Sequence, residues 1–196
     1  MTDLATRMVE ISLDGSTVEV DPSSTVLEAA LEHGVFIPHL CHDPDLTPAG
    51  VCRLCVVDVD GHLLTACNTP VTEGARIRTD TDAVQETRRG AAELLLVNHH
   101  RGTVDCAEGD ACELARIARF LEIDESRLER LRRPKRVLDV DTSNPFFVFD
   151  PNICVLCGIC VRTCDEIVGV GAIDFVKRGF DTTIGSAPDA QWIDSD

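Results

Sequence analysis

The chain has 196 residues, 34 of them acidic against 18 lysines and arginines, which gives a formal net charge of −16 at pH 7. This charge disfavours nucleic acid and anionic membrane surfaces as main partners, because both attract Lys and Arg. No apolar run is long enough to span a membrane, and residues 1–15 lack the apolar region of a secretory signal. We therefore expect a cytoplasmic protein of one or two domains whose thiols stay reduced.

The first third of the chain has the pattern of a small β-rich domain. Alternating apolar and polar residues predict strands at residues 8–13, 17–20, 56–59, 63–66 and 75–79. Asp14-Gly15 and Asp60-Gly61 are two-residue turn signals that join these strands into hairpins. Between the hairpins, an apolar face from Val26 to Leu31 predicts a helix that Ser23 or Ser24 caps. Hairpin, helix, loop and hairpin, in this order, are typical of a β-grasp domain.

Four cysteines of this domain have the spacing C-x10-C-x2-C-x11-C: Cys41, Cys52, Cys55 and Cys67. Four thiolates are the ligands that a [2Fe–2S] cluster needs. A structural zinc ion also accepts four cysteines, but zinc sites usually pair two short C-x2-C hooks, and this group has one. The spacing therefore favours [2Fe–2S], with structural zinc or free buried thiols as the alternatives.

These residues carry a resemblance to a known family. Residues 8–79 resemble the [2Fe–2S] domain at the start of the large iron–sulfur subunit of respiratory complex I. A similar domain opens the diaphorase small subunit of NAD-reducing hydrogenases and NAD-dependent formate dehydrogenases, which this chain is closest to in layout, and also some iron-only hydrogenases. The resemblance rests on the long gap after Cys41, where plant-type ferredoxins have four residues, and on the text ACNTPVTEG at residues 66–74.

The middle of the chain begins with a predicted helix over residues 81–97. Its apolar stripe is predicted to consist of Ala83, Val84, Thr87, Ala91, Leu94 and Leu95. A second, shorter helix is predicted over residues 124–133, capped by Asp124.

In the resembling family, the segment after the first of these helices holds a [4Fe–4S] cluster on one histidine and three cysteines, spaced H-x3-C-x2-C-x5-C. His99, Cys106 and Cys112 match this pattern, whereas Thr103 stands at the first cysteine position. A threonine hydroxyl is a poor iron ligand beside a thiolate.

Three outcomes remain open for this middle site. A [4Fe–4S] cluster is held by three protein ligands, or with Asp105 or His100 completing the set. A [3Fe–4S] cluster takes its place. Or the cluster has been lost, and the matching residues are remnants.

The last third contains the run C-x2-C-x2-C-x3-C of bacterial ferredoxins: Cys154, Cys157, Cys160 and Cys164. The text CVRTCDEI resembles the first of two such runs in the diaphorase-type subunits, but no second run follows in this sequence. In two-cluster ferredoxins the fourth cysteine serves the other cluster. Cys164 therefore completes a single [4Fe–4S] cluster, or is spare beside a ligand from elsewhere, or belongs to a shortened form of a longer subunit. We expect one cluster with Cys164 included.

These segments predict an α+β fold in three parts. Residues 1–80 form the β-grasp [2Fe–2S] domain, residues 81–135 a helical segment with the possible His/Cys site, and residues 136–196 a small ferredoxin-like [4Fe–4S] lobe. The cofactors are one [2Fe–2S] cluster and one or two [4Fe–4S] clusters.

The resemblance implies an iron–sulfur subunit that relays electrons between two partners. One is a flavin-containing NAD(P)H dehydrogenase subunit, and the other is a catalytic subunit of hydrogenase, formate dehydrogenase or complex I type. The sequence has no nucleotide-binding glycine motif, and no catalytic residue or substrate site is predicted. Two alternatives are a freestanding soluble ferredoxin-like carrier and a non-redox protein with structural zinc.

Overall fold

The computed structural model describes residues 7–99, 112–132 and 137–194. The chain divides into two compact units. Unit 1 consists of Met1–His42 and Pro48–Ala92, and unit 2 consists of Asp43–Thr47 and Glu93–Asp196. The predicted ligand Cys106, the substituted position Thr103 and the alternative ligands Asp105 and His100 lie outside the described residues.

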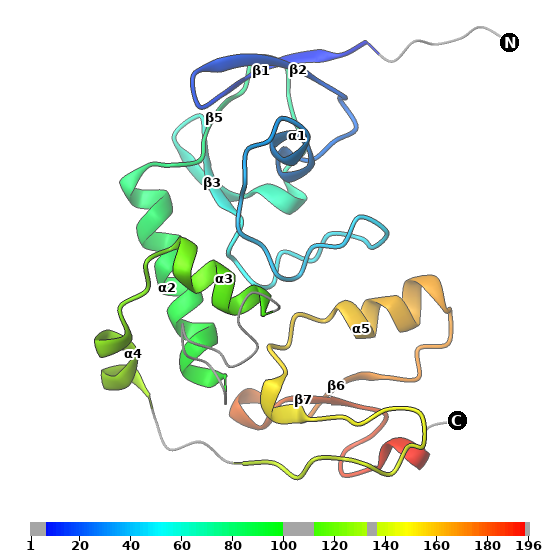
Figure 1. The fold of residues 1–196 in the computed structure, drawn as a ribbon. Helices are drawn as coiled ribbons and strands as arrows, with labels where there is room; N and C mark the ends of the chain where they lie inside the picture. Colours follow the sequence, from blue (N-terminus) through cyan, green and yellow to red (C-terminus); the bar gives the residue numbers. More distant parts are fainter. Residues whose placement is uncertain (1–6, 100–111, 133–136, 195–196) are drawn as a thin grey trace, which may run out of the picture. The chain divides into compact units, whose positions relative to one another are not determined.

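Unit 1 is built on a five-stranded sheet with the order β2-β1-β5-β3-β4 (Figure 1). The strands are β1 (Val9–Leu13), β2 (Ser16–Val20), β3 (Val56–Val59), β4 (His62–Thr65) and β5 (Arg76–Arg78). β1 and β5 pair in parallel, and the other pairs are antiparallel. Every predicted strand is present, with ends shifted by at most one residue.

The two Asp-Gly turns form as the sequence predicts. Asp14 and Gly15 have φ angles of 48° and 85°, and Asp60 and Gly61 have 51° and 87°. A two-residue hairpin loop with both residues at positive φ matches the right-handed twist of the strands, and Asp-Gly adopts it at little cost. The hairpins β1–β2 and β3–β4 are therefore encoded locally.

The helix α1 (Val26–Glu32) is capped by Thr25, not by the predicted Ser23 or Ser24. The Thr25 side chain accepts a hydrogen bond from the amide of Glu28, and the Glu28 carboxylate accepts one from the amide of Thr25 at 2.7 Å. This reciprocal capping box satisfies two amides that the start of a helix otherwise leaves unpaired. The stronger cap lies one or two residues after the predicted ones.

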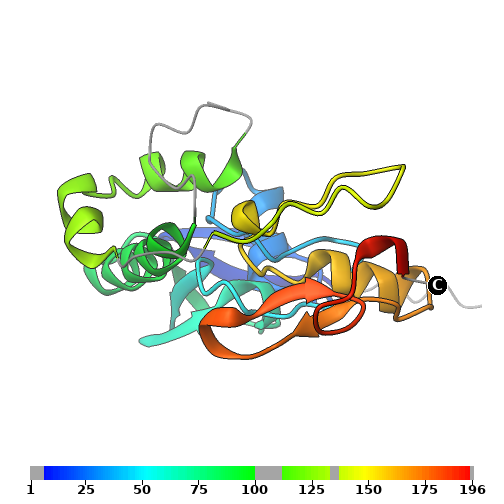
Figure 2. The same ribbon diagram turned by 90° about the horizontal axis from the view of Figure 1, so that it is seen from below.

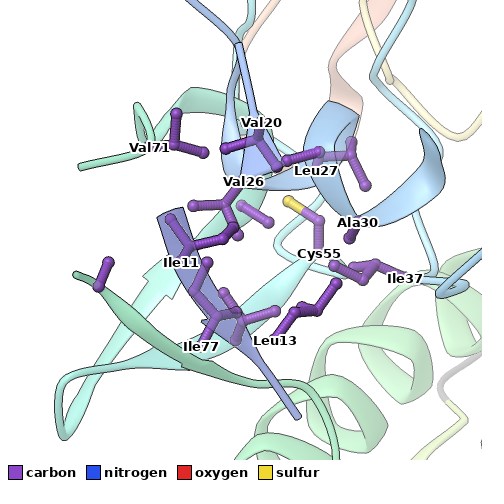
Figure 3. Close-up of a cluster of buried hydrophobic side chains, with 14 of the residues drawn as sticks. Ile11, Leu13, Val20, Val26, Leu27, Ala30, Ile37, Cys55, Val71 and Ile77 are labelled. Atoms are coloured by element: carbon purple, nitrogen blue, oxygen red, sulfur yellow. The ribbon is translucent and has the colours of Figure 1, made fainter. Parts of the chain in front are cut away.

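Apolar side chains of α1 pack against the sheet and form the core of unit 1, which Figure 3 shows. The core includes Ile11, Leu13, Val20, Val26, Leu27, Ala30, Ile37, Val57, Val71 and Ile77, together with Cys55 and Cys67. Burying each large aliphatic side chain contributes about 1.5–3 kcal/mol. The first cysteine group is therefore attached directly to the best-packed part of the unit.

The helix α2 (Asp82–Asn98) matches the predicted range, but its buried face is not the predicted one. Its fully buried residues are spaced four apart: Val84, Arg88, Ala92 and Leu96. Three residues of the predicted stripe are exposed: Ala83, Thr87 and Leu94. The helix is turned so that Arg88 faces inward, where its Nε donates to the Val56 carbonyl oxygen at 2.8 Å.

In unit 2, two short helices follow the end of α2. They are α3 (Glu113–Phe120), which no sequence pattern had indicated, and α4 (Glu125–Leu131), which is capped by Asp124 as predicted. Leu114, Ile117 and Leu128 are buried. The mostly buried Glu93 carboxylate joins α2 to this group through an ion pair with Arg127 at 2.7 Å.

The last third of the chain, which belongs to unit 2, has only short elements joined by irregular segments. It contains η3 (Pro151–Ile153), α5 (Ile159–Arg162) continued by the wider turn η4 (Thr163–Ile167), η5 (Gly179–Asp181) and η6 (Trp192–Asp194). An antiparallel ribbon of β6 (Asp174–Val176) and β7 (Thr183–Gly185) lies beside α5 (Figure 2). Among the described residues, none of the helices combines the length and apolar character that crossing a bilayer requires.

Candidate metal centres

The first cysteine group comes together in unit 1 from three separate stretches of chain. Cys41 lies in the loop after α1, Cys52 and Cys55 lie in the loop that enters β3, and Cys67 lies in η1 (Ala66–Asn68). All four side chains are buried and none is in a disulfide. The Sγ atoms of Cys41 and Cys52 are 3.4 Å apart, and Cys67 hydrogen-bonds to both Cys41 and Cys55. The structure therefore brings together all four predicted ligands.

Thiol protons are shared unequally in this group. The pKa of Cys41 falls to about 2, because Cys52 and then Cys67 donate to its sulfur, and the pKa of Cys55 falls to about 7 with Cys67 as donor. The pKa values of Cys52 and Cys67 rise, because each thiol donates a hydrogen bond. Cys52 donates to Cys41, and Cys67 donates to Cys41 and Cys55. A cluster at this site would bind all four sulfurs as thiolates.

Backbone amides also point at these sulfurs. The amides of Cys52 and Val51 donate to Cys41, and those of Leu54 and Leu40 donate to Cys52. Amide donors stabilise negative charge on sulfur and tune the potential of an iron–sulfur cluster. The donor set, its burial and its amide surroundings therefore fit a [2Fe–2S] cluster.

No three His, Cys, Asp or Glu side chains in the described part of the chain are grouped as a site for a single metal ion. A [2Fe–2S] cluster makes no such demand, because each of its two irons takes only two protein ligands.

The second cysteine group lies along one continuous stretch of unit 2. Cys154 directly follows η3, and Cys157 lies in the turn between η3 and α5. Cys160 lies in α5 and Cys164 in η4. The Cys154 sulfur accepts a hydrogen bond from the amide of Leu156 at 3.4 Å, and the Cys164 sulfur accepts one from the amide of Ala172 at 3.3 Å. Cys160 is exposed, and the other three are half-buried.

Burial raises the pKa of both Cys154 and Cys160, and the neighbouring Cys157 raises each further. Four thiols with amide donors at two of the sulfurs are a donor set that suits a [4Fe–4S] cluster. That assignment, including the role of Cys164, stays a prediction.

Gly158 makes the turn between the second and third cysteines of this run possible. It has a φ of 73° at the N-terminus of α5, a conformation that glycine adopts without strain. A Cβ at this position would lie 3.0 Å from Cζ of Phe175 in β6. Both the turn and the close approach of the ribbon therefore require glycine.

The middle site is only partly within the described residues. Cys112 is half-buried at the N-terminus of α3. The Nε2 atom of His99 lies 3.0 Å from the carbonyl oxygen of Ile153, the residue before Cys154. Cys106 and position Thr103 lie outside the described residues, so the middle site stays a prediction.

Comparisons with known proteins agree with this geometry. The family model for a 2Fe-2S iron-sulfur cluster binding domain matches residues 6–82. One NADH-quinone oxidoreductase subunit of Rhizobium meliloti is 37% identical over 182 residues, which are 90% of this chain and 21% of that protein. The alpha subunit of the NADPH-Fe(3+) oxidoreductase of Geobacter sulfurreducens is 36% identical over 179 residues, again 90% of this chain and 21% of that protein.

Two further relatives extend the comparison. The mitochondrial NADH-ubiquinone oxidoreductase 78 kDa subunit of Candida albicans is 32% identical over 180 residues, 91% of this chain and 25% of that protein. This chain therefore spans only a fifth to a quarter of these curated relatives. Among solved structures, a chain of the NAD+-reducing [NiFe]-hydrogenase in the H2-reduced state superposes with a TM-score of 0.77 at 31% identity, covering 90% of this chain and 74% of that one.

Proposed function

This chain belongs to the iron–sulfur family that includes the matching NADH-quinone oxidoreductase subunit of Rhizobium meliloti and the matching chain of NAD+-reducing [NiFe]-hydrogenase, and from that premise we propose that it relays electrons within an NAD(P)-linked oxidoreductase complex. The membership confirms the resemblance drawn from residues 8–79. The observation that carries the proposal is the buried convergence of four cysteine thiols in unit 1, inside the matched 2Fe-2S domain.

The residues of unit 1 have a defined task in such a relay. When bound, the cluster accepts and releases one electron at a time. Cys41, Cys52, Cys55 and Cys67 would hold it, and the amides that donate to Cys41 and Cys52 would stabilise its negative charge. Burial of all four sulfurs excludes water and lowers the reorganisation that accompanies each electron.

For the last third, we propose a [4Fe–4S] cluster on Cys154, Cys157, Cys160 and Cys164. The bacterial-ferredoxin spacing and the amide donors to Cys154 and Cys164 support it. The proposed sites lie in the three segments expected from the sequence. Residues 1–80 carry the first cluster, residues 81–135 the middle site and residues 136–196 the last cluster.

The middle segment carries a third candidate site on His99, Cys106 and Cys112, which match the family pattern except at Thr103. The Cys106→Ser and Cys112→Ser double variant tests it. A loss of about four irons relative to the unchanged protein would support a [4Fe–4S] cluster there, about three would support [3Fe–4S], and an unchanged count would show that the site is empty.

The proposed partners are a flavin-containing NAD(P)H dehydrogenase subunit and a second catalytic subunit, in a cytoplasmic complex. The cytoplasmic location rests on the cysteines, since all nine in the described residues are free and thiols persist in a reducing compartment. Size-exclusion chromatography of an anaerobic cell extract tests the complex. The chain should elute with a flavoprotein; elution apart from any flavin would favour the freestanding carrier instead.

A further inference from the structure

Arg88 is a buried cation placed beside the first cysteine group. It lies on α2 and is 1% exposed, and its side chain is the largest of the fully buried ones in the described residues. Its Nε donates to the carbonyl oxygen of Val56 at 2.8 Å, and Val56 directly follows Cys55 in the chain. A guanidinium in this position is unusual, because arginine is almost never fully buried unless it is paired.

The charge of Arg88 has no close partner in the described part of the chain. Its Nη2 atom is buried without a hydrogen-bond acceptor there, and none of the ion pairs among the described residues includes it. Burying an uncompensated charge is costly, so a folded protein retains one only beside a source of opposite charge. The positive charge of Arg88 is therefore not balanced by an ion pair within the described part of the chain.

The anions that act on Arg88 point to the cluster site. Burial lowers the pKa of Arg88 to about 10, while Cys55 is the largest of the negative groups that raise it, ahead of Asp80 and Asp14. Both carboxylates are engaged elsewhere: Asp14 accepts hydrogen bonds from the amide and hydroxyl of Thr79, and Asp80 accepts one from the side chain of Gln85. Arg88 thus stays protonated at neutral pH, and its hydrogen bond to Val56 places it next to the residue that follows Cys55.

Charge near an iron–sulfur cluster sets its reduction potential. A [2Fe–2S] cluster with four thiolates is negative, and reduction adds one more negative charge. A buried cation is screened little by water or salt, so it stabilises the reduced state more than the oxidised state. Arg88 should therefore raise the potential of the cluster, whereas an exposed arginine on the same helix should not.

We propose that Arg88 sets the potential of the [2Fe–2S] cluster held by Cys41, Cys52, Cys55 and Cys67, by placing a buried positive charge beside the Cys55 ligand. The proposal rests on the function proposed above, since it requires that cluster. In this proposal α2 both connects the segments that carry the clusters and supplies the charge that sets the potential of the first one.

An EPR-monitored redox titration of the whole protein under anaerobic conditions tests this role. Arg88→Met removes the charge and keeps much of the volume, and Arg88→Lys keeps the charge. Arg89→Met is the matched control, because Arg89 is the next residue on α2 and is exposed. At a fixed potential, Arg88→Met should lower the reduced-to-oxidised ratio of the [2Fe–2S] signal about tenfold, a downward shift of about 59 mV for one electron.

The control variants define the alternatives. Arg88→Lys should stay close to the unchanged protein, and Arg89→Met should match it, because solvent screens an exposed charge. A cluster that is present in Arg88→Met with an unchanged potential would overturn the proposal and leave the proposed function intact. No [2Fe–2S] signal in the unchanged protein would instead overturn the proposed function.

A loss of the cluster in Arg88→Met also has a defined meaning. In that case, Arg88→Gln, which also lacks the charge, replaces Arg88→Met in the comparison with Arg88→Lys. Retention of the cluster only where the charge is kept would support an electrostatic role, since the cation would then be needed to hold the negative cluster. Loss in all three variants, Lys included, would assign Arg88 to packing and overturn the proposal.

Discussion

The sulfur atoms of Cys41 and Cys52 lie 3.4 Å apart, although the two residues are eleven positions apart in the chain. This separation is far longer than a disulfide bond of about 2.05 Å. Two buried thiolates so close together would repel each other strongly unless a proton or a metal lay between them. The two sulfurs are therefore placed to share a proton or a metal, and Cys55 and Cys67 complete the set of four thiols.

Cys52→Ser should remove the first cluster and leave the last one in place. Serine keeps the size of the side chain, but its hydroxyl is a poor ligand for iron beside a thiolate. We expect a loss of about two irons per chain and of the [2Fe–2S] EPR signal. A [2Fe–2S] signal of full intensity in this variant would contradict the assignment of Cys52 as a ligand.

Two single variants, Cys157→Ser and Cys164→Ser, test the last cluster and its fourth ligand. Each should remove about four irons and spare the [2Fe–2S] signal, which makes these variants the counterparts of Cys52→Ser. Retention of the cluster in Cys164→Ser alone would show that Cys164 is spare and that the fourth ligand lies elsewhere. Iron analysis and EPR of the reduced proteins distinguish these results.

Gly158→Ala should destabilise the turn that carries Cys157 and Cys160. A Cβ there meets the positive φ of 73° and the Phe175 ring at 3.0 Å, and the conformation alone costs about 1–2 kcal/mol. We expect lower iron occupancy of the last cluster and a lower free energy of unfolding in denaturant. Normal occupancy and stability would show that the turn can relax.

Gly90→Ala is the matched control for that substitution. Gly90 lies inside α2, without positive φ, and an added Cβ there meets nothing within 4 Å. Alanine in a helix interior is favoured over glycine by about 0.5–1 kcal/mol. The free energy of unfolding should therefore rise, with the iron content unchanged.

Asp141 should make part of the stability of unit 2 depend on pH. Hydrogen bonds from Ser143 and from the amide of Trp192 lower the pKa of its carboxyl below the usual 3.8. A lowered folded pKa means that this stabilisation is present above pH 3.8 and is lost as the pH falls through the folded pKa. Asp141→Asn should remove that part of the dependence.

Trp192 is a convenient reporter for this prediction, because it is the only tryptophan. Its ring contacts those of Phe147 and Phe149, with centroids 5.4 and 4.9 Å away. Its fluorescence should change as the pH falls below 3.8 in the unchanged protein and change less in Asp141→Asn. Visible absorbance, followed in parallel, separates acid loss of a cluster from this local transition. Identical fluorescence profiles would contradict the role of Asp141.

The parts of the fold that the sequence predicts well are those encoded by neighbouring residues. The Asp14-Gly15 and Asp60-Gly61 turns define both hairpins because few other dipeptides adopt two positive φ angles in succession. The spacing from Cys41 to Cys67 predicts a group of ligands because metal clusters constrain sequence directly. These signals need no knowledge of tertiary contacts.

The buried face of α2 shows where such reasoning fails. Apolar periodicity assigned Leu94 to the core and left Arg88 outside, yet Leu94 is 67% exposed and Arg88 is 1% exposed. The inward position of Arg88 goes with its hydrogen bond to the Val56 carbonyl oxygen, which lies 32 positions away in the chain. One signal was available: Arg88 falls four residues from both Val84 and Ala92, in the middle of a buried row.

The measurement that tests the central claim most directly is the content of iron and acid-labile sulfide in anaerobically purified protein, combined with EPR after dithionite reduction. We predict at least about six irons per chain, two for the first cluster and four for the last, with both signals present. A count of about ten would add a cluster at the middle site. Zinc in place of iron, or iron without labile sulfide, would contradict the electron-relay account.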